Sequence, residues 1–298
     1  MANFQSIDLV TKFSPLVDER FEVESKTSLV TNKDYDFIGT HSIKIYSVST
    51  AEMNDYGRNV DMGTGEGQVL SRYGAIKDLA TDTQEVSMEK DRSFIFVIDK
   101  MDQDETLQAL NAGSALARQL REVVIPEVDK YTYKKMADNA GHTEYSVTID
   151  NTNAYTVLND ANEYLDEKKV PADGRVAVVT PKFYKYLKQD KNAVLETEIG
   201  QNMRIKGVIA NMDGLVIQKV VSTLLPQGLN FMVAHKVATT QAIKLAEYNV
   251  NPGGVLASGQ IVTGRIYYTA FVRKNKKDAI YTSMSTAEPS ENTEDPGL

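Results

Sequence analysis

The chain has 298 residues, of which 42% are hydrophobic and 25% charged, and its formal net charge is −8. This composition is typical of a globular protein with a sizeable core, and not of a disordered chain. The acidic balance argues against a dedicated nucleic-acid binder, because affinity for phosphate rests on clustered lysine and arginine. The absence of cysteine excludes disulfides, thiolate catalysis and cysteine metal sites.

No stretch of the sequence has the roughly 18 consecutive apolar residues that a membrane span needs. The first residues, MANFQS, lack the basic region and the apolar core of a signal peptide. We therefore expect a protein that is made and kept in a cytoplasm and has no membrane partner.

The first hundred residues predict extended structure more than helix. Residues 1–35 mix apolar and charged side chains without glycine and resemble an arm that seeks a partner surface, with a short helix near 15–21. Residues 35–48 contain the alternation of a half-buried strand. Residues 50–89 carry few large aliphatic side chains and predict a long hairpin or loop, whose returning strand is expected at 84–88 and 94–98.

A long amphipathic helix is predicted after the acidic turn 99–106, where carboxylates favour a helix start. From Leu107 to about Gly141 apolar residues recur at helical spacing, which at about 1.5 Å per residue gives a helix of roughly 50 Å. Pro126 lies inside this pattern and removes a backbone donor, so we expect a bend near Val123. We interpret the stretch as one kinked helix.

The second half mixes strands and helices. Helices are predicted at 153–168 and at 182–189, the latter opened by Pro181, because proline suits the first helical position. The continuous apolar run at 175–180 predicts a buried strand. Further strands are expected at 146–149, 215–221, 231–234 and 242–247, with a final hairpin of 264–273 and 278–283 joined by the basic turn 274–277.

The sequence contains no pattern that indicates catalysis or metal binding. The three histidines, His41, His142 and His235, lie far apart, and we expect His142 to cap the long helix. The cluster Gly63, Gly65 and Gly67 lacks the Lys-Ser or Lys-Thr of a phosphate loop and is interpreted as a loop tip. Helix capping explains the carboxylates of the acidic turn better than cation binding does: Asp99, Asp102, Asp104 and Glu105. We name no catalytic, cofactor-binding or metal-binding residue and expect no enzyme.

The order of these parts resembles the major capsid proteins of tailed bacteriophages with the HK97 fold. The residues that carry the resemblance are 92–99, 102–106 and above all Val124 to Tyr131, which is similar to the "VIPExD" text of the spine helix in such proteins. The strand and helix at 176–181 and beyond, and the passage 205–217, add to it. The resemblance covers roughly residues 35 to 283, and its weight lies in the order and spacing of these motifs.

The resemblance implies an α+β chain with the HK97-like capsid fold. In that fold residues 1–40 would form an N-terminal arm and residues 50–98 an extended β-loop. Residues 99–170 and 260–285 would form a peripheral domain that includes the spine helix 104–140, and residues 171–259 an axial domain. Residues 286–298 are acidic and are expected to form a disordered tail.

The function that the resemblance implies is that of a shell subunit in a virion. Copies of the chain would assemble into hexamers and pentamers of an icosahedral head around double-stranded DNA, which they would contact without sequence specificity. The other expected partners are a separate scaffold protein, a portal and decoration proteins, and assembly would take place in the host cytoplasm. Some relatives crosslink a loop lysine to a neighbour's asparagine, but nothing near Lys77 or Lys90 matches that reaction, so we expect non-covalent locking.

Three alternatives stay open on the sequence alone. The first is an encapsulin-like protein compartment, which the sequence does not separate from a viral head. The second is a soluble α/β enzyme or ligand-binding protein with its site in the region from Arg175 to Gly214. The third is a phage tail or head-completion protein, which would favour β structure over a spine helix.

Overall fold

The computed structural model describes residues 25–37, 40–48, 50–58, 72–73, 79, 81–101, 112–191, 208–253 and 258–287. The chain divides into two compact units, residues 40–87 and the remainder on both sides of them. Several expectations lie outside the described residues: the short helix near 15–21, the glycine cluster, Lys77, three of the four carboxylates of the acidic turn and the chain after residue 287.

The smaller unit is built on an antiparallel hairpin. Strand β1 (Ser42–Val48) pairs with β2 (Thr81–Ser87) from Ser42↔Ser87 to Val48↔Thr81. The strand expected within residues 35–48 is therefore confirmed over β1. Tyr46 and Val48 alternate along β1 and expose their large side chains, as expected for one face of a strand.

The larger unit contains a three-stranded antiparallel sheet with the order β3-β10-β9. Its strands are β3 (Lys90–Asp99), β10 (Gly259–Val272) and β9 (Thr239–Pro252). The prediction that residues 94–98 continue the returning strand of the hairpin is wrong. Residues 81–87 pair with β1, whereas residues 90–99 pair with β10 in a different sheet, from Tyr268↔Lys90 to Gly259↔Asp99.

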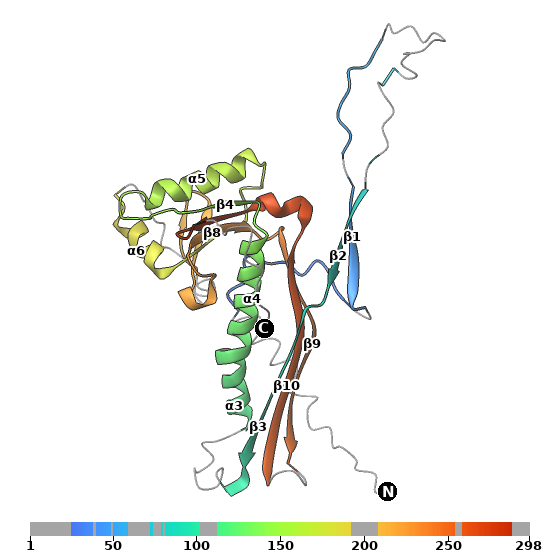
Figure 1. The fold of residues 1–298 in the computed structure, drawn as a ribbon, viewed down its shortest axis with the longest axis vertical. Coiled ribbons are helices and arrows are strands. Elements are labelled where there is room, and N and C mark those ends of the chain that lie inside the picture. The colour runs from blue at the N-terminus through green and yellow to red at the C-terminus, as the bar shows by residue number, and fades with distance from the viewer. Residues whose placement is uncertain are drawn as a thin grey trace. The chain divides into compact units, whose positions relative to one another are not determined.

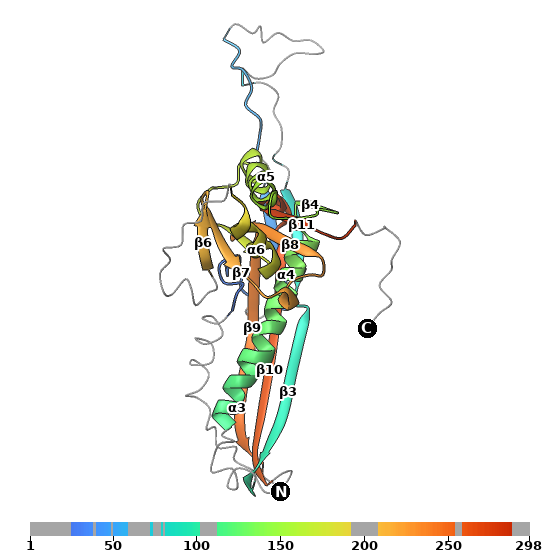
Figure 2. The same cartoon turned by 90° about the vertical axis from the view of Figure 1, so that its left-hand side faces the viewer.

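One face of this sheet is covered by the long helix, which runs beside β3, β10 and β9 (Figure 2). The helix is continuous from 112 to 138 and consists of α3 (Ala112–Gln119), a π-helical turn (Leu120–Val124) and α4 (Ile125–Asp138). The predicted helix is thus confirmed over these residues, which span roughly 40 Å at about 1.5 Å per residue. The sequence predicts a bend near Val123, and the structure has this π turn there, in which the backbone N–H of Ile125 donates to the carbonyl of Leu120. A π turn just before a proline lets the helix accommodate a residue that has no backbone donor.

A six-stranded mixed sheet forms the other half of the larger unit, in the order β4-β11-β8-β5-β7-β6 (Figure 1). In chain order its strands are β4 (His142–Glu144), β5 (Arg175–Val179), β6 (Val208–Met212), β7 (Leu215–Lys219), β8 (Leu229–His235) and β11 (Ile280–Met284). All five residues of β5 are buried, which confirms the strand predicted from its continuous apolar run. The strand expected at 146–149 is wrong, because pairing with β11 occurs at 142–144 instead.

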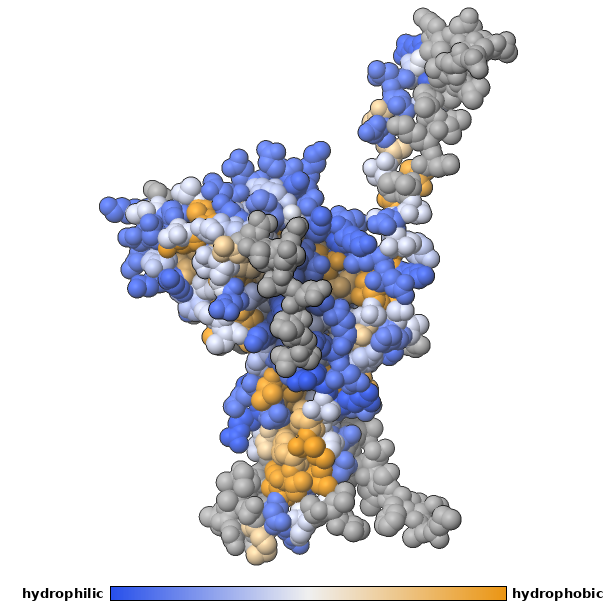
Figure 3. Space-filling view, in the orientation of Figure 1, coloured by the Kyte–Doolittle hydropathy of each residue, from blue (hydrophilic) through white to orange (hydrophobic). Residues whose placement is uncertain are grey.

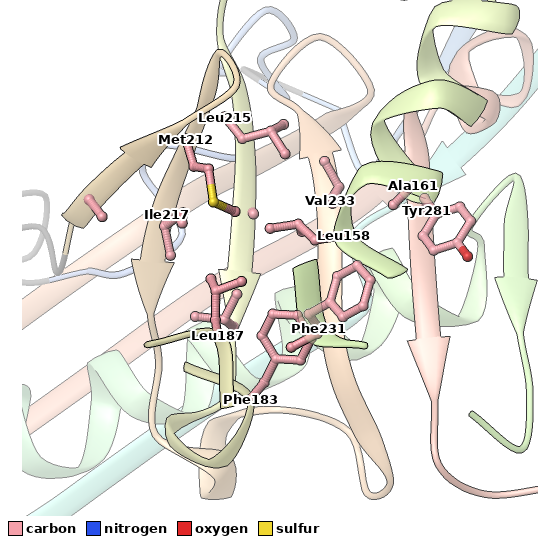
Figure 4. Packing of buried hydrophobic residues seen from close by; sticks show 14 of the residues in the cluster. Leu158, Ala161, Phe183, Leu187, Met212, Leu215, Ile217, Phe231, Val233 and Tyr281 are labelled. Atoms are coloured by element: carbon pink, nitrogen blue, oxygen red, sulfur yellow. The ribbon is translucent and has the colours of Figure 1, made fainter. Parts of the chain in front are cut away.

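The six-stranded sheet is covered on both faces, and the alternation along β5 matches this. Ala177 and Val179 pack against α5 (Ala154–Glu167) and α6 (Pro181–Gln189), together with Leu158, Phe183 and Phe231 (Figure 4). Val176 and Val178 face the opposite core, which contains residues of α4. Both helices were predicted, and Thr180 caps α6 by accepting the backbone N–H of Phe183, as expected for a helix with proline at its first position.

The long helix contributes to two cores. Ile125 and Val128 pack on the three-stranded sheet, whereas Tyr133 and Met136, two turns further on, pack on the six-stranded sheet. The predicted hairpin of 264–273 and 278–283 is wrong, because the chain passes from one sheet to the other between these strands. Strand β10 stays in the three-stranded sheet, the chain passes through a 3-10 helix (Lys274–Ala279), and β11 enters the six-stranded sheet.

Candidate functional site

The histidines have structural surroundings in the part of the chain that the structure describes. His235 is buried, its Nε2 lies 2.9 Å from the carbonyl oxygen of Asp173 and its Nδ1 accepts the backbone N–H of Val237. Within the described ranges no group of three or more histidine or acidic side chains could hold a metal ion. Nor is any helix among them long and apolar enough to cross a membrane.

His142 does not cap the long helix, so that expectation is wrong. The helix ends at Asp138, and the side-chain amide of Asn139 donates to the carbonyl of Lys135. The ring of His142 instead belongs to a cluster of three rings: its centroid lies 5.0 Å from that of Tyr164 and 5.2 Å from that of Tyr281, and the two tyrosine rings lie 5.7 Å apart. This stacking joins β4 to α5 and β11.

In the region from Arg175 to Gly214, where the sequence leaves an enzyme site open, the structure describes residues 175–191 and 208–214, and Arg175 has a structural role there. The guanidinium of Arg175 is buried and donates to Asp166 Oδ1 at 2.7 Å, to Asn162 Oδ1 at 2.6 Å and to the carbonyl of Pro171 at 3.0 Å. A guanidinium with these partners holds α5 and its following turn against β5.

The described residues of the acidic turn and of the loop lysines, Asp99 and Lys90, also have structural contacts. Asp99 Oδ1 accepts the backbone N–H of Met101 at 2.8 Å, which is the local capping expected of it. Lys90 places its ammonium 5.8 Å from the ring centroid of Tyr131. Asp99 belongs to no group of side chains among the described residues that could hold a metal ion.

The exposed edge of β3 is the feature with the clearest implication for function. Phe94, Phe96 and Ile98 point toward the helix, and alternation therefore directs Ile95 and Val97 away from it. Ile95 is 69% exposed and Val97 49% exposed. Among the described strands β3 pairs only with β10, so its other edge carries unpaired backbone donors and acceptors beside apolar side chains. Such an edge is a template for association with another chain.

A groove lies between β3 and the long helix. Its volume is about 340 Å³, and it is lined by Phe96, Ile98, Ala115, Arg118, Gln119, Glu122 and Val123. Val123, in the π turn, is 46% exposed. Figure 3 shows hydrophobic surface gathered over the stretch where α3 and β3 lie. An apolar strip of this kind, bordered by charged side chains, is typical of a protein–protein interface.

Ion pairs fix the opposite end of β3. Arg92 Nε donates to Glu127 of the helix at 2.7 Å, and Arg265 of β10 pairs with Asp91 at 2.6 Å. The hydrogen bond from Arg265 lowers the pKa of Asp91. Because these pairs are exposed, each contributes little to the stability of the subunit, and their main effect is to fix the register and direction of the strand.

Glu89, just before β3, bridges to the helix as well. Burial favours its protonated form, but hydrogen bonds from Lys135 at 2.9 Å and Tyr131 at 2.8 Å outweigh this, and the pKa of Glu89 is lowered. Gly264 of β10 gives the ring of Phe94 room, since any side chain there would collide with it. The edge strand is therefore held firmly although one of its edges is open.

A buried carboxylate on the helix holds the segment that precedes the smaller unit. Asp129 is 1% exposed and accepts three hydrogen bonds, from Ser25 Oγ at 2.6 Å, from the backbone N–H of Lys26 at 2.7 Å and from Thr27 Oγ1 at 3.1 Å. The carbonyl of Lys26 accepts from Tyr133 Oη at 2.9 Å and from Gln218 Nε2 at 2.7 Å. Burial raises the pKa of Asp129, and the hydrogen bonds offset this only in part.

Sequence reasoning did not predict that Asp129 holds residues 25–27 by hydrogen bonds. A signal was present, because Asp129 lies on the helical face that carries Ile125, Val128 and Met136, and a carboxylate on a buried face needs donors. The sequence does not reveal that those donors come from a segment about a hundred residues earlier.

Comparisons with known proteins bear on the fold. No protein-family model matches the chain, and no curated protein matches it. Among solved structures, one described as Mycobacterium phage Che8 is similar with a TM-score of 0.66 and 16% identity, over 89% of this chain and 92% of that one. The capsid structure of the cyanophage P-SCSP1u is similar with a TM-score of 0.62 and 14% identity, over 95% and 90%.

A third similar structure is a virus-like particle from Pyrococcus furiosus, with a TM-score of 0.53 and 10% identity over 93% of this chain and 100% of that one. At these identities the likeness concerns the fold. The chain thus has the α+β fold of phage capsid chains, as the resemblance to the HK97 fold implied.

Proposed function

We propose that this chain is the major capsid protein of a tailed bacteriophage and that its copies build the shell of the head. The observation that carries the proposal is the likeness of fold over nearly the whole chain to the subunit of the cyanophage capsid. The open edge of β3 and the apolar groove beside it support the proposal, because neighbouring copies would bury both.

The finer parts of the proposal follow from the resemblance. Hexamers and pentamers would form an icosahedral head in the host cytoplasm around double-stranded DNA, with a scaffold protein, a portal and decoration proteins as partners. Residues 1–40 would serve as the N-terminal arm and residues 50–98 as the extended β-loop. Residues 99–170 and 260–285 would form the peripheral domain and residues 171–259 the axial domain. The shell subunit would have no enzymatic role, and the partners found for His235 and Arg175 support this.

A protein compartment that holds cargo instead of a genome is the second candidate. It is favoured by the likeness to the Pyrococcus virus-like particle, which extends over all of that chain. The contents of purified particles separate the two: extraction and nuclease digestion detect a genome, and mass spectrometry detects a cargo protein.

The experiment that tests the shell function is negative-stain electron microscopy with sedimentation of the purified protein, alone and co-expressed with neighbouring gene products. We expect closed particles or the rings from which they form. A small species of uniform size under every condition would contradict the proposal and favour a soluble enzyme or binding protein.

A variant of the hairpin tests the extended loop. Since Val48 and Thr81 are paired, residues 49–80 can be replaced by Asn-Gly, which suits a two-residue turn. We expect a folded subunit with the thermal stability of the wild type that no longer forms shells, because the loop that reaches a neighbour is missing. Normal particles from this variant would show that the loop is not needed for assembly.

A further inference from the structure

Two helices on the same face of the six-stranded sheet carry opposite charge. The exposed side of α6 presents Lys182, Lys185 and Lys188, here called the basic face. The exposed side of α5 presents Asp160, Glu163 and Glu167, here called the acidic face. Helix α5 contains no lysine or arginine, and α6 contains no aspartate or glutamate. The charges are therefore segregated by helix.

Helical geometry places both faces directly toward solvent. In α6 the buried residues are Phe183 and Leu187, and at 100° per residue Lys185 lies opposite them with the other two lysines on either side. In α5 the buried residues Leu158, Ala161 and Leu165 lie opposite the three acids in the same way. Each helix thus packs its apolar side on the sheet and presents one sign of charge outward.

The two faces do not neutralise each other within the subunit. Among the described residues no lysine of the basic face and no carboxylate of the acidic face forms an ion pair; the carboxylate of α5 that does, Asp166, pairs with Arg175 at 2.7 Å. Both helices pack their apolar sides on one layer of the six-stranded sheet (Figure 1), and their charged sides face away from that layer. The faces are available to a partner.

Aromatic rings make the basic face more ordered than a set of free lysines. Lys188 lies 5.7 Å from the ring centroid of Tyr184, and Lys219 of β7 lies 5.7 Å from the same ring. Lys182 lies 6.0 Å from the ring of Tyr186. Cation–π contacts restrain the side chains, so less conformational entropy is lost when the face meets an anionic surface.

We propose that the basic face of α6 docks on the acidic face of α5 in a neighbouring copy of the chain, an inference that rests on the proposed shell function. The argument for this occupant is charge complementarity: the chain is acidic overall, yet each face has a partner of opposite sign, the same number of charges and similar helical spacing elsewhere on the same chain. In a closed shell this contact would be heterologous: it would repeat from copy to copy and generate a ring when the rotation closes, whereas two copies that exchange both faces would form a two-fold pair.

Single exposed ion pairs are weak, but the free energies of a contact that repeats around a ring add up over all the copies in the ring. Complementary charge also orients approaching copies, because pairing two basic faces or two acidic faces would bring like charges together. The interface would accordingly be sensitive to salt.

A charge exchange tests the proposal. The variant Lys182→Glu, Lys185→Glu, Lys188→Glu is compared with Asp160→Lys, Glu163→Lys, Glu167→Lys, and with the sixfold variant that combines them. The matched control is Lys130→Glu, Lys134→Glu, Lys236→Glu, which changes three exposed lysines elsewhere and has the same net charge as the first variant. Circular dichroism and thermal melts establish that each subunit folds, and sedimentation and electron microscopy follow assembly.

We expect each threefold variant on α5 or α6 to lower the yield of rings or shells at least tenfold at low salt, the sixfold variant to restore it, and the control to assemble as the wild type does. If the wild type assembles and the α6 variant assembles equally well, this proposal is wrong while the shell function stands. If the sixfold variant does not regain assembly, the docking proposal is wrong as well. It is also wrong if the α6 variant assembles normally but retains less DNA, because the basic face would then be a nucleic-acid contact. A wild type that stays a small species overturns both proposals.

Discussion

The two sheets of the larger unit differ in how completely their surfaces are covered. The six-stranded sheet has helices α5 and α6 on one face and part of α4 with the segment around Val30 on the other, so both of its faces are buried. The three-stranded sheet has one face on the long helix, and the edge strand β3 leaves apolar side chains exposed. The faces of the first sheet are covered within one chain, whereas the second sheet has an outer edge on β3 that no described strand pairs with. The surfaces that stay open to a partner therefore differ in kind: an apolar strand edge on the three-stranded sheet and the charged sides of α5 and α6 on the six-stranded half.

The largest effect is expected from Leu120→Asp, in the core that joins the helix to the three-stranded sheet. Leu120 is 5% exposed, and an unpaired carboxylate there costs several kcal/mol, roughly the whole stability of a domain. We expect no soluble folded subunit, as judged by expression and thermal melting.

The control for this variant is Val123→Asp, in the same π turn but 46% exposed. We expect it to fold with little change in melting temperature and to impair assembly, because it charges the groove beside β3. Wild-type thermal unfolding of Leu120→Asp would contradict the assignment of the helix to this core.

A matched pair of isoleucines compares the two sheets directly. Ile217 is fully buried in the six-stranded half, and Ile95 is 69% exposed on β3. We expect Ile217→Ala to lower the free energy of unfolding of the subunit by about 2–5 kcal/mol, and Ile95→Ala to change it by less than about 0.5 kcal/mol. Urea unfolding of the unassembled subunit measures both values.

For assembly, we expect Ile95 to matter more than Ile217. If a neighbouring copy covers Ile95, its truncation removes about 1 kcal/mol or more of burial per contact, which raises the subunit concentration needed for shells roughly fivefold. Light scattering across a concentration series measures this. An unchanged threshold would show that the exposed side chain of β3 stays exposed in the shell.

A pH-dependent effect is expected from Asp129, where the helix holds residues 25–27. Burial raises its pKa above the ordinary value of 3.8, so the folded state binds this proton more tightly than the unfolded state does. The resulting stabilisation is fully present below pH 3.8 and is lost as the pH rises through the raised pKa. Asp129→Asn cannot titrate, so the difference in unfolding free energy, wild type minus variant, should fall by about 1 kcal/mol or more per unit of pKa shift as the pH rises.

Urea unfolding of both proteins between about pH 3 and pH 7 measures this difference. The level that it reaches above the raised pKa also reports the loss of an acceptor for the backbone of Lys26. A difference that rises with pH would mean that the three donors lower the pKa of Asp129 in spite of its burial.

The elements were easier to predict from the sequence than their partners. The apolar run of β5, the proline that opens α6 and the apolar stripe of the long helix are local signals, and each was interpreted correctly. Residues 94–98 were recognised as a strand but assigned to the wrong sheet, since alternation fixes which faces a strand presents and not which strand lies beside it. The basic turn between β10 and β11 suggested a hairpin for the same reason, although the chain changes sheets there.

The candidate surfaces were less accessible to sequence reasoning than the fold. Sequence reasoning named no catalytic residue, and it revealed neither the hydrogen bonds that hold residues 25–27 to Asp129 nor the open edge of β3. Both depend on contacts between distant segments, Ser25 with Asp129 and Lys90 with Tyr268. The opposite charges of α5 and α6 can be read from the sequence. Their role as two complementary surfaces could be inferred only once the structure showed that both helices cover one face of a sheet.

The shared helix has a mechanical consequence. One rod of 27 residues supplies Ile125 and Val128 to one core and Tyr133 and Met136 to the other. A twist of either sheet about this rod must be absorbed by the other sheet or by the rod itself. The place where the rod yields most readily is its single wide turn, 120–124, because the regular ladder of hydrogen bonds is already interrupted there. Force applied to one half of the subunit would therefore be transmitted to the other half through a lever with one compliant joint.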